Sequence, residues 1–226
     1  LRLLERVGKV TAVFATGREW TSEQMERTLD AFDVPVVSRY QDAPIGSLVE
    51  RYQKIFDPDY LNTNGVIVPE IDRLRVAELV ERHDLVWIHT LKVANAFRRY
   101  HWPSSVMDVD DFPSRYHRSA ASHAPSLKMR IMRHQKAFSC RRHETKCHDR
   151  FDLLTVCKEE DRLSFGDSSR IHVVPNGFTP PDSSSSSIER RGDRIGMIGD
   201  FNYLPNHDGL KWFIREALQR VRERVP

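Results

Sequence analysis

The stretch Asp84-Leu85-Val86-Trp87-Ile88-His89 decides the fold class, because a short apolar run of this kind predicts a buried strand. The run Ser105-Val106-Met107-Asp108-Val109 predicts a second strand, and residues 91–100 predict a helix between the two. Two strands joined through a helix are typical of a parallel sheet. This unit therefore favours an α/β fold.

The same alternation continues on both sides of this unit. Further strands are predicted at residues 10–15, 34–37, 151–157 and 170–174. Further helices are predicted at residues 21–32, 44–56, 69–83, 126–150 and 158–165. The helix at 69–83 has an apolar stripe made of Ile71, Leu74, Val76, Leu79 and Val80. We therefore expect a Rossmann-like, mostly parallel sheet with helices covering both faces.

The composition changes after residue 181, where five consecutive serines (Ser183–Ser187) predict a polar linker over residues 182–193. Residues 1–181 are expected to form the first domain. Residues 194–226 restart the pattern with one strand, at 194–199, and one helix. Such a unit cannot bury a core of its own, so we expect an incomplete second domain. The opening at Leu1, without Met, also suggests a chain cut from a longer pattern.

The bulk composition excludes some classes of protein. The 226 residues have a formal net charge of +3, so the whole chain is not a strongly basic nucleic-acid binder. No apolar run reaches the roughly 20 residues of a membrane-spanning helix, and no signal peptide is visible. The odd count of three cysteines (Cys140, Cys147 and Cys157) favours a reducing compartment. We expect a cytoplasmic protein, with peripheral contact at the inner face of the membrane as a further possibility.

The loop after Val109 is the first candidate site, because ligands of doubly wound sheets bind at the carboxyl ends of the strands. It places Asp108, Asp110 and Asp111 within four positions. Carboxylates that close repel one another, which favours a group ready to take up a proton or to bind a ligand. The alternative is that Asp111-Phe112-Pro113-Ser114 is only a polar turn.

Two other loops meet the same rule. Pro175-Asn176-Gly177-Phe178 predicts a turn in which glycine adopts a positive φ. In the loop that starts at Gly199, Asn206 is expected to be the N-cap of a helix whose free N–H groups could hold a diphosphate. Neither of the common glycine-rich phosphate motifs is present.

The segment from Cys140 to His148 contains two cysteines and two histidines at spacings that resemble a zinc site. All four lie on one helical run, so we expect one helix face and no metal. The helix at 126–150 is also rich in basic residues. It is either a solvated face or a surface attracted to an anionic membrane or acceptor. Nucleic acid is disfavoured, because no series of aromatic residues accompanies the cations.

Three stretches are similar to the group 1 glycosyltransferases. They are Phe151-Asp152-x5-Lys158-Glu159-Glu160-Asp161, Ile171-His172-Val173-Val174-Pro175-Asn176-Gly177-Phe178, and residues 195–206 with the Trp212-Phe213 helix. The resemblance covers roughly residues 84–224. It implies a GT-B fold, in which two Rossmann-like domains face a cleft. It also implies a nucleotide-sugar donor, a glycan or lipid-linked acceptor, retention of configuration, and no metal or cofactor.

By the same resemblance, site residues fall in three groups. The carboxylates that would orient the acceptor or the reacting sugar are Asp110 and Asp111. The acceptor side would include His89, Asp108, Ser114, Asn176 and Gly177. The donor side would include Gly199, Asp200, Asn202 and Asn206.

The chain departs from the family pattern at several of these positions. Asp110 stands where the family often has histidine, and Asp200 and Asn206 stand where it often has arginine and lysine. The family's donor-binding glutamates would lie beyond Pro226, so we do not expect turnover by this portion alone. The alternatives are a non-catalytic sugar- or nucleotide-binding module of the same fold, and a basic adaptor for membranes or nucleic acids.

Overall fold

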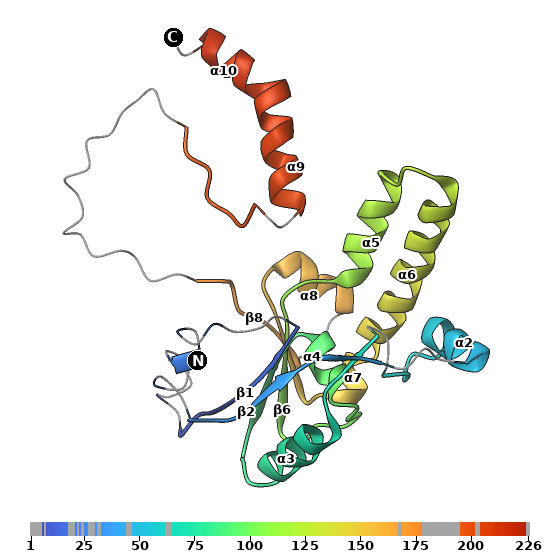
Figure 1. The fold of residues 1–226 in the computed structure, drawn as a ribbon, viewed down its shortest axis with the longest axis vertical. Helices are drawn as coiled ribbons and strands as arrows, with labels where there is room; N and C mark the ends of the chain where they lie inside the picture. Colours follow the sequence, from blue (N-terminus) through green and yellow to red (C-terminus); the bar gives the residue numbers. More distant parts are fainter. Residues whose placement is uncertain are drawn as a thin grey trace, which may run out of the picture. The chain divides into compact units, whose positions relative to one another are not determined.

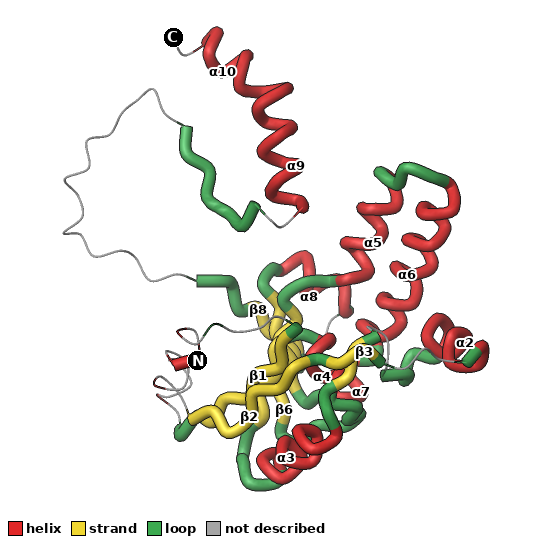
Figure 2. Tube along the Cα trace, in the orientation of Figure 1, coloured by secondary structure: helices red, strands yellow, loops and turns green. Residues whose placement is uncertain are grey.

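A computed structural model describes residues 6, 8–17, 21, 23, 25–26, 30, 33–43, 47–61, 65–166, 169–177, 195–201 and 204–224 (Figures 1 and 2). The chain divides into two units, Leu1–Gly177 and Phe178–Pro226. The predicted serine linker lies outside the described residues, as does most of the predicted helix at 21–32. No helix in the described part of the chain is long and apolar enough to cross a membrane.

The first unit contains a four-stranded parallel sheet with the order β5-β6-β7-β8. Its strands are β5 (Val86–His89), β6 (Ser105–Val109), β7 (Leu153–Val156) and β8 (Ile171–Val173). The helices α4 (Leu91–Ala96), α5 (Pro113–Ser122), α6 (Leu127–Thr145), α7 (Cys147–Arg150) and α8 (Glu159–Phe165) belong to the connections. All three strand pairs are parallel, which confirms the predicted α/β, Rossmann-like class.

The amino-terminal part of this unit contributes two small sheets. Strands β1 (Thr11–Thr16) and β2 (Asp33–Arg39) pair in parallel, as predicted. Strands β3 (Gln41–Asp42) and β4 (Val66–Ile67) form a short antiparallel pair that we had not predicted. Helix α2 (Leu48–Phe56) begins later than expected, because Ser47 and Glu50 form a capping box there.

The core lies mainly against one face of the four-stranded sheet. Ile88, Met107 and Leu154 are buried on that face, with Val156 and Ile171. On the opposite face, Trp87 and Leu153 remain 40% and 38% exposed. Val106 and Thr155 are nonetheless buried on this same face, so it is covered in part.

The buried residues of helix α3 (Glu70–Val80) differ from the predicted apolar stripe. Val76 and Val80 are buried, but Ile71 and Leu74 are exposed. The buried face is therefore narrower than the sequence pattern indicated.

The helices α5 and α6 form a hairpin that stands away from the sheet (Figure 1). We had predicted one helix over 126–150, whereas the structure has α6 and a separate turn of helix, α7, divided at Lys146. Helix α5 was not predicted. Pro113 lies in its first turn, where a missing backbone N–H costs nothing.

The second unit is described by itself. Residues 195–200 form no strand, so the predicted strand at 194–199 is wrong over this range. A strand needs a neighbour to pair its backbone groups, and none is present among the described residues of this unit. The predicted helix does form, as α9 (Leu204–Trp212), a π-helical turn at Phe213–Ala217, and α10 (Leu218–Arg224).

Candidate functional site

A row of hydrogen-bonded side chains crosses the carboxyl-terminal part of the four-stranded sheet. The strand register aligns His89 with Asp108, and Asp108 with Thr155. Nδ1 of His89 lies 3.0 Å from Oδ2 of Asp108, and the Thr155 hydroxyl donates to Oδ1 of Asp108 at 2.9 Å. In-register neighbours share a face, so this row lies on the incompletely covered face, with Asp108 as its centre.

A second polar group lies one step further along the chain, beyond the strand ends. The Cys157 thiol follows β7 and lies 3.5 Å from Oδ1 of Asp110 and 3.6 Å from Oδ1 of Asn176. Burial raises the pKa of this thiol, and the hydrogen bond to Asp110 raises it further. Cys157 is therefore a hydrogen-bond donor rather than a thiolate nucleophile. Three successive strand ends thus contribute to one cluster.

The backbone next to this row is strained. Thr90, directly after His89, has φ 70°, which is unfavourable for a β-branched residue. Its N–H donates to the carbonyl of Asp108 at 3.0 Å, so the ladder between β5 and β6 continues through it. Backbone strain of this kind concentrates at functional sites, because surrounding contacts must hold it. Here it fixes the direction in which the chain leaves His89.

The predicted catalytic residue Asp111 and the predicted acceptor-side residues Gly177 and Ser114 do not join this cluster. Asp111 is exposed just before α5, and Gly177 is exposed at the end of the first unit without the positive φ that we predicted. Ser114 is buried and donates both its N–H and its hydroxyl to Glu144. Ser114 is thus occupied within the fold, and we leave it out of the proposed site.

The predicted donor-side residues lie in the second unit. Asn206 is the third residue of α9, so its predicted role as N-cap is wrong. Its Nδ2 instead donates to the carbonyl of Asp200 at 3.1 Å. A Cβ added at Gly199 would lie 2.9 Å from this same nitrogen, so a larger residue there would have to displace the Asn206 side chain. Asn202 lies outside the described residues.

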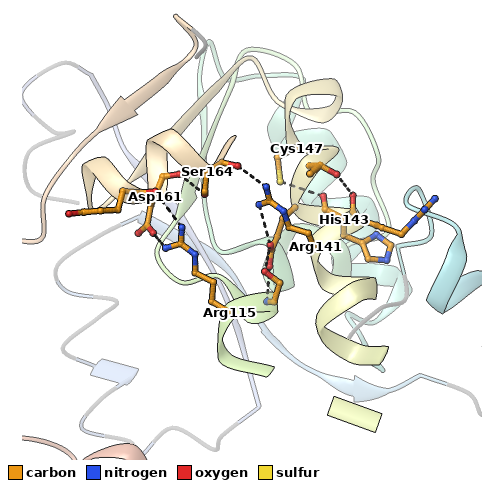
Figure 3. Close-up of polar contacts among 11 residues, drawn as sticks. Arg115, Arg141, His143, Cys147, Asp161 and Ser164 are labelled. Carbon is orange, nitrogen blue, oxygen red and sulfur yellow. Dashed lines mark hydrogen bonds and ion pairs between the residues drawn. The ribbon is translucent and has the colours of Figure 1, made fainter. Parts of the chain in front are cut away.

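The predicted zinc-like segment lies on α6 and α7. His143 Nδ1 is 2.7 Å from the carbonyl of Pro58, and the buried Cys147 thiol contacts the His143 carbonyl (Figure 3). Burial raises the pKa of Cys140 to about 11 and that of Cys147 to about 12. Within the described ranges, no group of three His, Cys, Asp or Glu side chains is arranged to hold a metal.

A cavity of about 470 Å³ lies near the opposite, amino-terminal edge of the sheet. Its walls include Arg99, Arg150 and Arg170. Arg150 is buried and donates to Asn95 Oδ1 at 2.8 Å and to the carbonyl of Tyr100 at 3.3 Å. Those bonds hold the segment after α4 to the rest of the core. Because the cavity lies at the amino-terminal edge of the sheet, it is separate from the polar row at the carboxyl-terminal part of the strands.

Sequence reasoning missed two members of the cluster, Thr155 and Cys157. Thr155 was visible as the one polar residue in an apolar strand, at the position that pairs with Asp108. Cys157 was visible as the residue that follows that strand. Both needed the strand register to be recognised, because neither belongs to a motif.

No protein-family model matches this chain, and comparisons with curated proteins and with solved structures found no match either.

Proposed function

We propose that this chain is the acceptor-side portion of a glycosyltransferase that moves a sugar from a nucleotide-sugar to a glycan or lipid-linked acceptor. The observation that carries the proposal is the polar cluster at the carboxyl ends of four adjacent parallel strands. It combines His89, Asp108 and Thr155 with Asp110 and Asn176. Carboxylates and imidazoles at this edge of a Rossmann-like sheet are suited to binding sugar hydroxyls.

In this mechanism, Asp110 is the group closest to the chemistry. It follows β6 and accepts a weak hydrogen bond from a thiol, which leaves its other oxygen available for a sugar hydroxyl. A carboxylate there can orient the acceptor hydroxyl or remove its proton as the new bond forms. Asp108 is already engaged by His89 and Thr155, so it would position His89 rather than react.

The donor side of the proposal rests on the sequence resemblance. Asp200 and Asn206 form a local turn with each other, and neither supplies a cation for a diphosphate. Transfer would therefore need donor-side residues beyond those in this chain. The same observation favours a second candidate, a sugar- or nucleotide-binding module that does not catalyse transfer.

The test combines binding with turnover. Labelled chain is titrated with a panel of glycans and nucleotide-sugars, and chemical shifts of His89, Cys157 and Asn176 are followed. In parallel, the full-length protein is assayed for release of nucleoside diphosphate from each donor. Shifts at the cluster together with acceptor-dependent release are expected. Binding without release favours the binding module. If the protein shows no binding and no release, both candidates are contradicted.

A further inference from the structure

The α5–α6 hairpin has an unusual charge. Residues 113–145 contain eight lysines and arginines and one acidic residue, Glu144, although the whole chain has a formal charge of only +3. The basic residues are Arg115, Arg118, Lys128, Arg130, Arg133, Lys136, Arg141 and Arg142. Glu144 is buried against Ser114, so no acidic side chain of the hairpin reaches solvent. The hairpin is therefore a concentrated positive surface.

These cations fall into two groups. Near the sheet, Arg115 pairs with Asp161, and Arg141 donates to the carbonyl of Ser164 at 2.7 Å (Figure 3). Nearer the tip, Lys128 and Arg130 are exposed and have no carboxylate within ion-pair distance among the described residues. The cations near the tip are therefore available to a partner, as are the exposed Arg118 and Lys136, for which no ion pair is found among the described residues. The structure thus narrows the predicted basic helix at 126–150 to its first half.

The exposed surface of α6 also includes large apolar side chains. Leu127 is 72% exposed and Ile131 is 58% exposed, and Phe138 is also largely open to solvent. Spacings of four and seven residues put these three side chains on one helix face. Lys128 and Arg130 flank that face on either side. An exposed apolar stripe with basic flanks is typical of helices that lie in a membrane interface.

Helix α2 extends this apolar surface. The rings of Phe56 and Phe138 are in contact, with centroids 6.5 Å apart, and Tyr52 packs on Phe56 at 4.7 Å. Leu48, in the first turn of α2, is 81% exposed. Large exposed apolar patches on a folded domain mark interaction surfaces. We call the surface made of Leu48, Tyr52, Phe56, Leu127, Ile131 and Phe138 the α2–α6 surface.

We propose that the α2–α6 surface docks onto an anionic lipid bilayer, with its apolar side chains at the level of the headgroups and with Lys128 and Arg130 facing anionic lipid. Two features of the surface favour a bilayer over nucleic acid. Its centre is aliphatic and aromatic, which suits the acyl boundary, and its cations lie beside that centre rather than in a groove. The proposal goes beyond glycosyl transfer and stands independently of it.

One further contact agrees with an anionic partner. Burial, together with the nearby cation Lys136, lowers the pKa of Lys54. Like charges therefore face each other between α2 and α6. Anionic headgroups would relieve this repulsion.

The test uses co-sedimentation with vesicles of phosphatidylcholine alone and of phosphatidylcholine mixed with phosphatidylglycerol. We expect binding to the anionic vesicles only, and we expect it to weaken as salt is added. Lys128→Glu with Arg130→Glu should lower the partition coefficient by more than about tenfold. Leu127→Ser with Ile131→Ser should lower it by a similar factor, and Leu48→Ser with Tyr52→Ser tests the α2 half.

Matched controls lie on α3 and the turn after it. Ile71→Ser with Leu74→Ser removes exposed apolar side chains outside the α2–α6 surface, and Arg82→Glu reverses an exposed charge. These variants should bind as the unmodified protein does, and circular dichroism checks that every variant is folded. Equal binding to neutral and anionic vesicles would overturn the proposal. So would unaltered binding by the α6 variants, or retention on an oligonucleotide or a protein in place of vesicles.

Discussion

The carboxylate of Glu144 accepts two hydrogen bonds from Ser114, one from the backbone N–H at 2.8 Å and one from the hydroxyl at 2.6 Å. Ser114 lies in the first turn of α5, where backbone N–H groups have no partner within the helix. An acid from α6 therefore caps the start of α5. Burial raises the pKa of Glu144, and the bonds from Ser114 oppose that rise.

Replacing Glu144 with alanine should destabilise the first unit. The change leaves the N–H and hydroxyl of Ser114 buried without an acceptor, which should lower the free energy of unfolding by about 3 kcal/mol. Glu144→Gln keeps one accepting oxygen, so this variant should lose about half as much free energy of unfolding. Urea denaturation measures both. Glu78→Ala, an exposed acid on α3, is the control and should change stability by less than about 0.5 kcal/mol. Equal effects at the two glutamates would contradict the capping role.

Lowering the pH should destabilise the α5–α6 hairpin, because His117 then takes up a proton. Nδ1 of this buried ring lies 3.1 Å from Nη1 of Arg133, an arrangement that requires neutral imidazole. Burial lowers the pKa of His117 from 6.5, and the nearby cations Lys136 and Arg133 lower it further. The folded state therefore binds fewer protons than the unfolded state. This contribution to stability is fully present above pH 6.5, the ordinary pKa of histidine. It is lost as the pH falls through the lowered pKa of His117 in the folded state.

The measurement is the urea midpoint at about pH 7.5 and at about pH 5.5. Unmodified protein should lose more stability between the two than His117→Gln, which cannot take up this proton. The pKa of His143 is also lowered, mainly by burial, so the variant should keep part of the slope. Identical slopes for the two proteins would show that His117 does not titrate as inferred.

Much of the parallel sheet could be predicted from the sequence, because its strands are short apolar runs that differ from the polar segments around them. β6 was predicted with its exact bounds, and β7 and β8 to within two residues at each end. How completely helices cover each face could not be predicted, since a continuous apolar run indicates burial without showing how many layers pack on it. Trp87 reads as a core residue in sequence and is half exposed in the structure.

Tertiary contacts explain the failures in the helices and the site. Helix α5 is polar and begins at a proline, so nothing local distinguishes it from a turn, and the carboxylate of Glu144 that caps it comes from 30 residues away. The strand predicted at 194–199 has suitable residues but no paired neighbour among the described ones. Thr155 became a candidate only through its register with Asp108.

The three cysteines should differ in their rate of alkylation. Cys147 is buried, and its pKa is raised to about 12, so it should react last. Cys157 is partly exposed, and its hydrogen bond to Asp110 raises its pKa. Asp110→Asn removes the negative charge beside this thiol and should speed its reaction several-fold, because the thiolate becomes less unfavourable. Peptide-resolved mass spectrometry after timed iodoacetamide treatment measures each rate. If the rate at Cys157 is unaltered, the thiol and Asp110 are not in contact.

Under the proposed function, Asp110→Asn should also lower glycosyl transfer by the full-length protein by more than about tenfold, because a positioned carboxylate that accepts a proton contributes at least that much to a rate. Asparagine has nearly the same shape and can still accept from the Cys157 thiol, so the fold should not change. The control is Asp84→Asn, which removes an exposed carboxylate from the amino end of β5, at the opposite edge of the sheet.

The two kinetic constants separate the roles open to Asp110. A fall in kcat with KM unchanged would mean that Asp110 acts in the transition state, as a base for the acceptor hydroxyl. A rise in KM for the acceptor with kcat unchanged would mean that it binds sugar in the ground state and leaves the chemistry to another group. Transfer that is unaffected by Asp110→Asn, or equally reduced by Asp84→Asn, would remove Asp110 from the site. The polar row around Asp108 would then become the next position to test for acceptor chemistry.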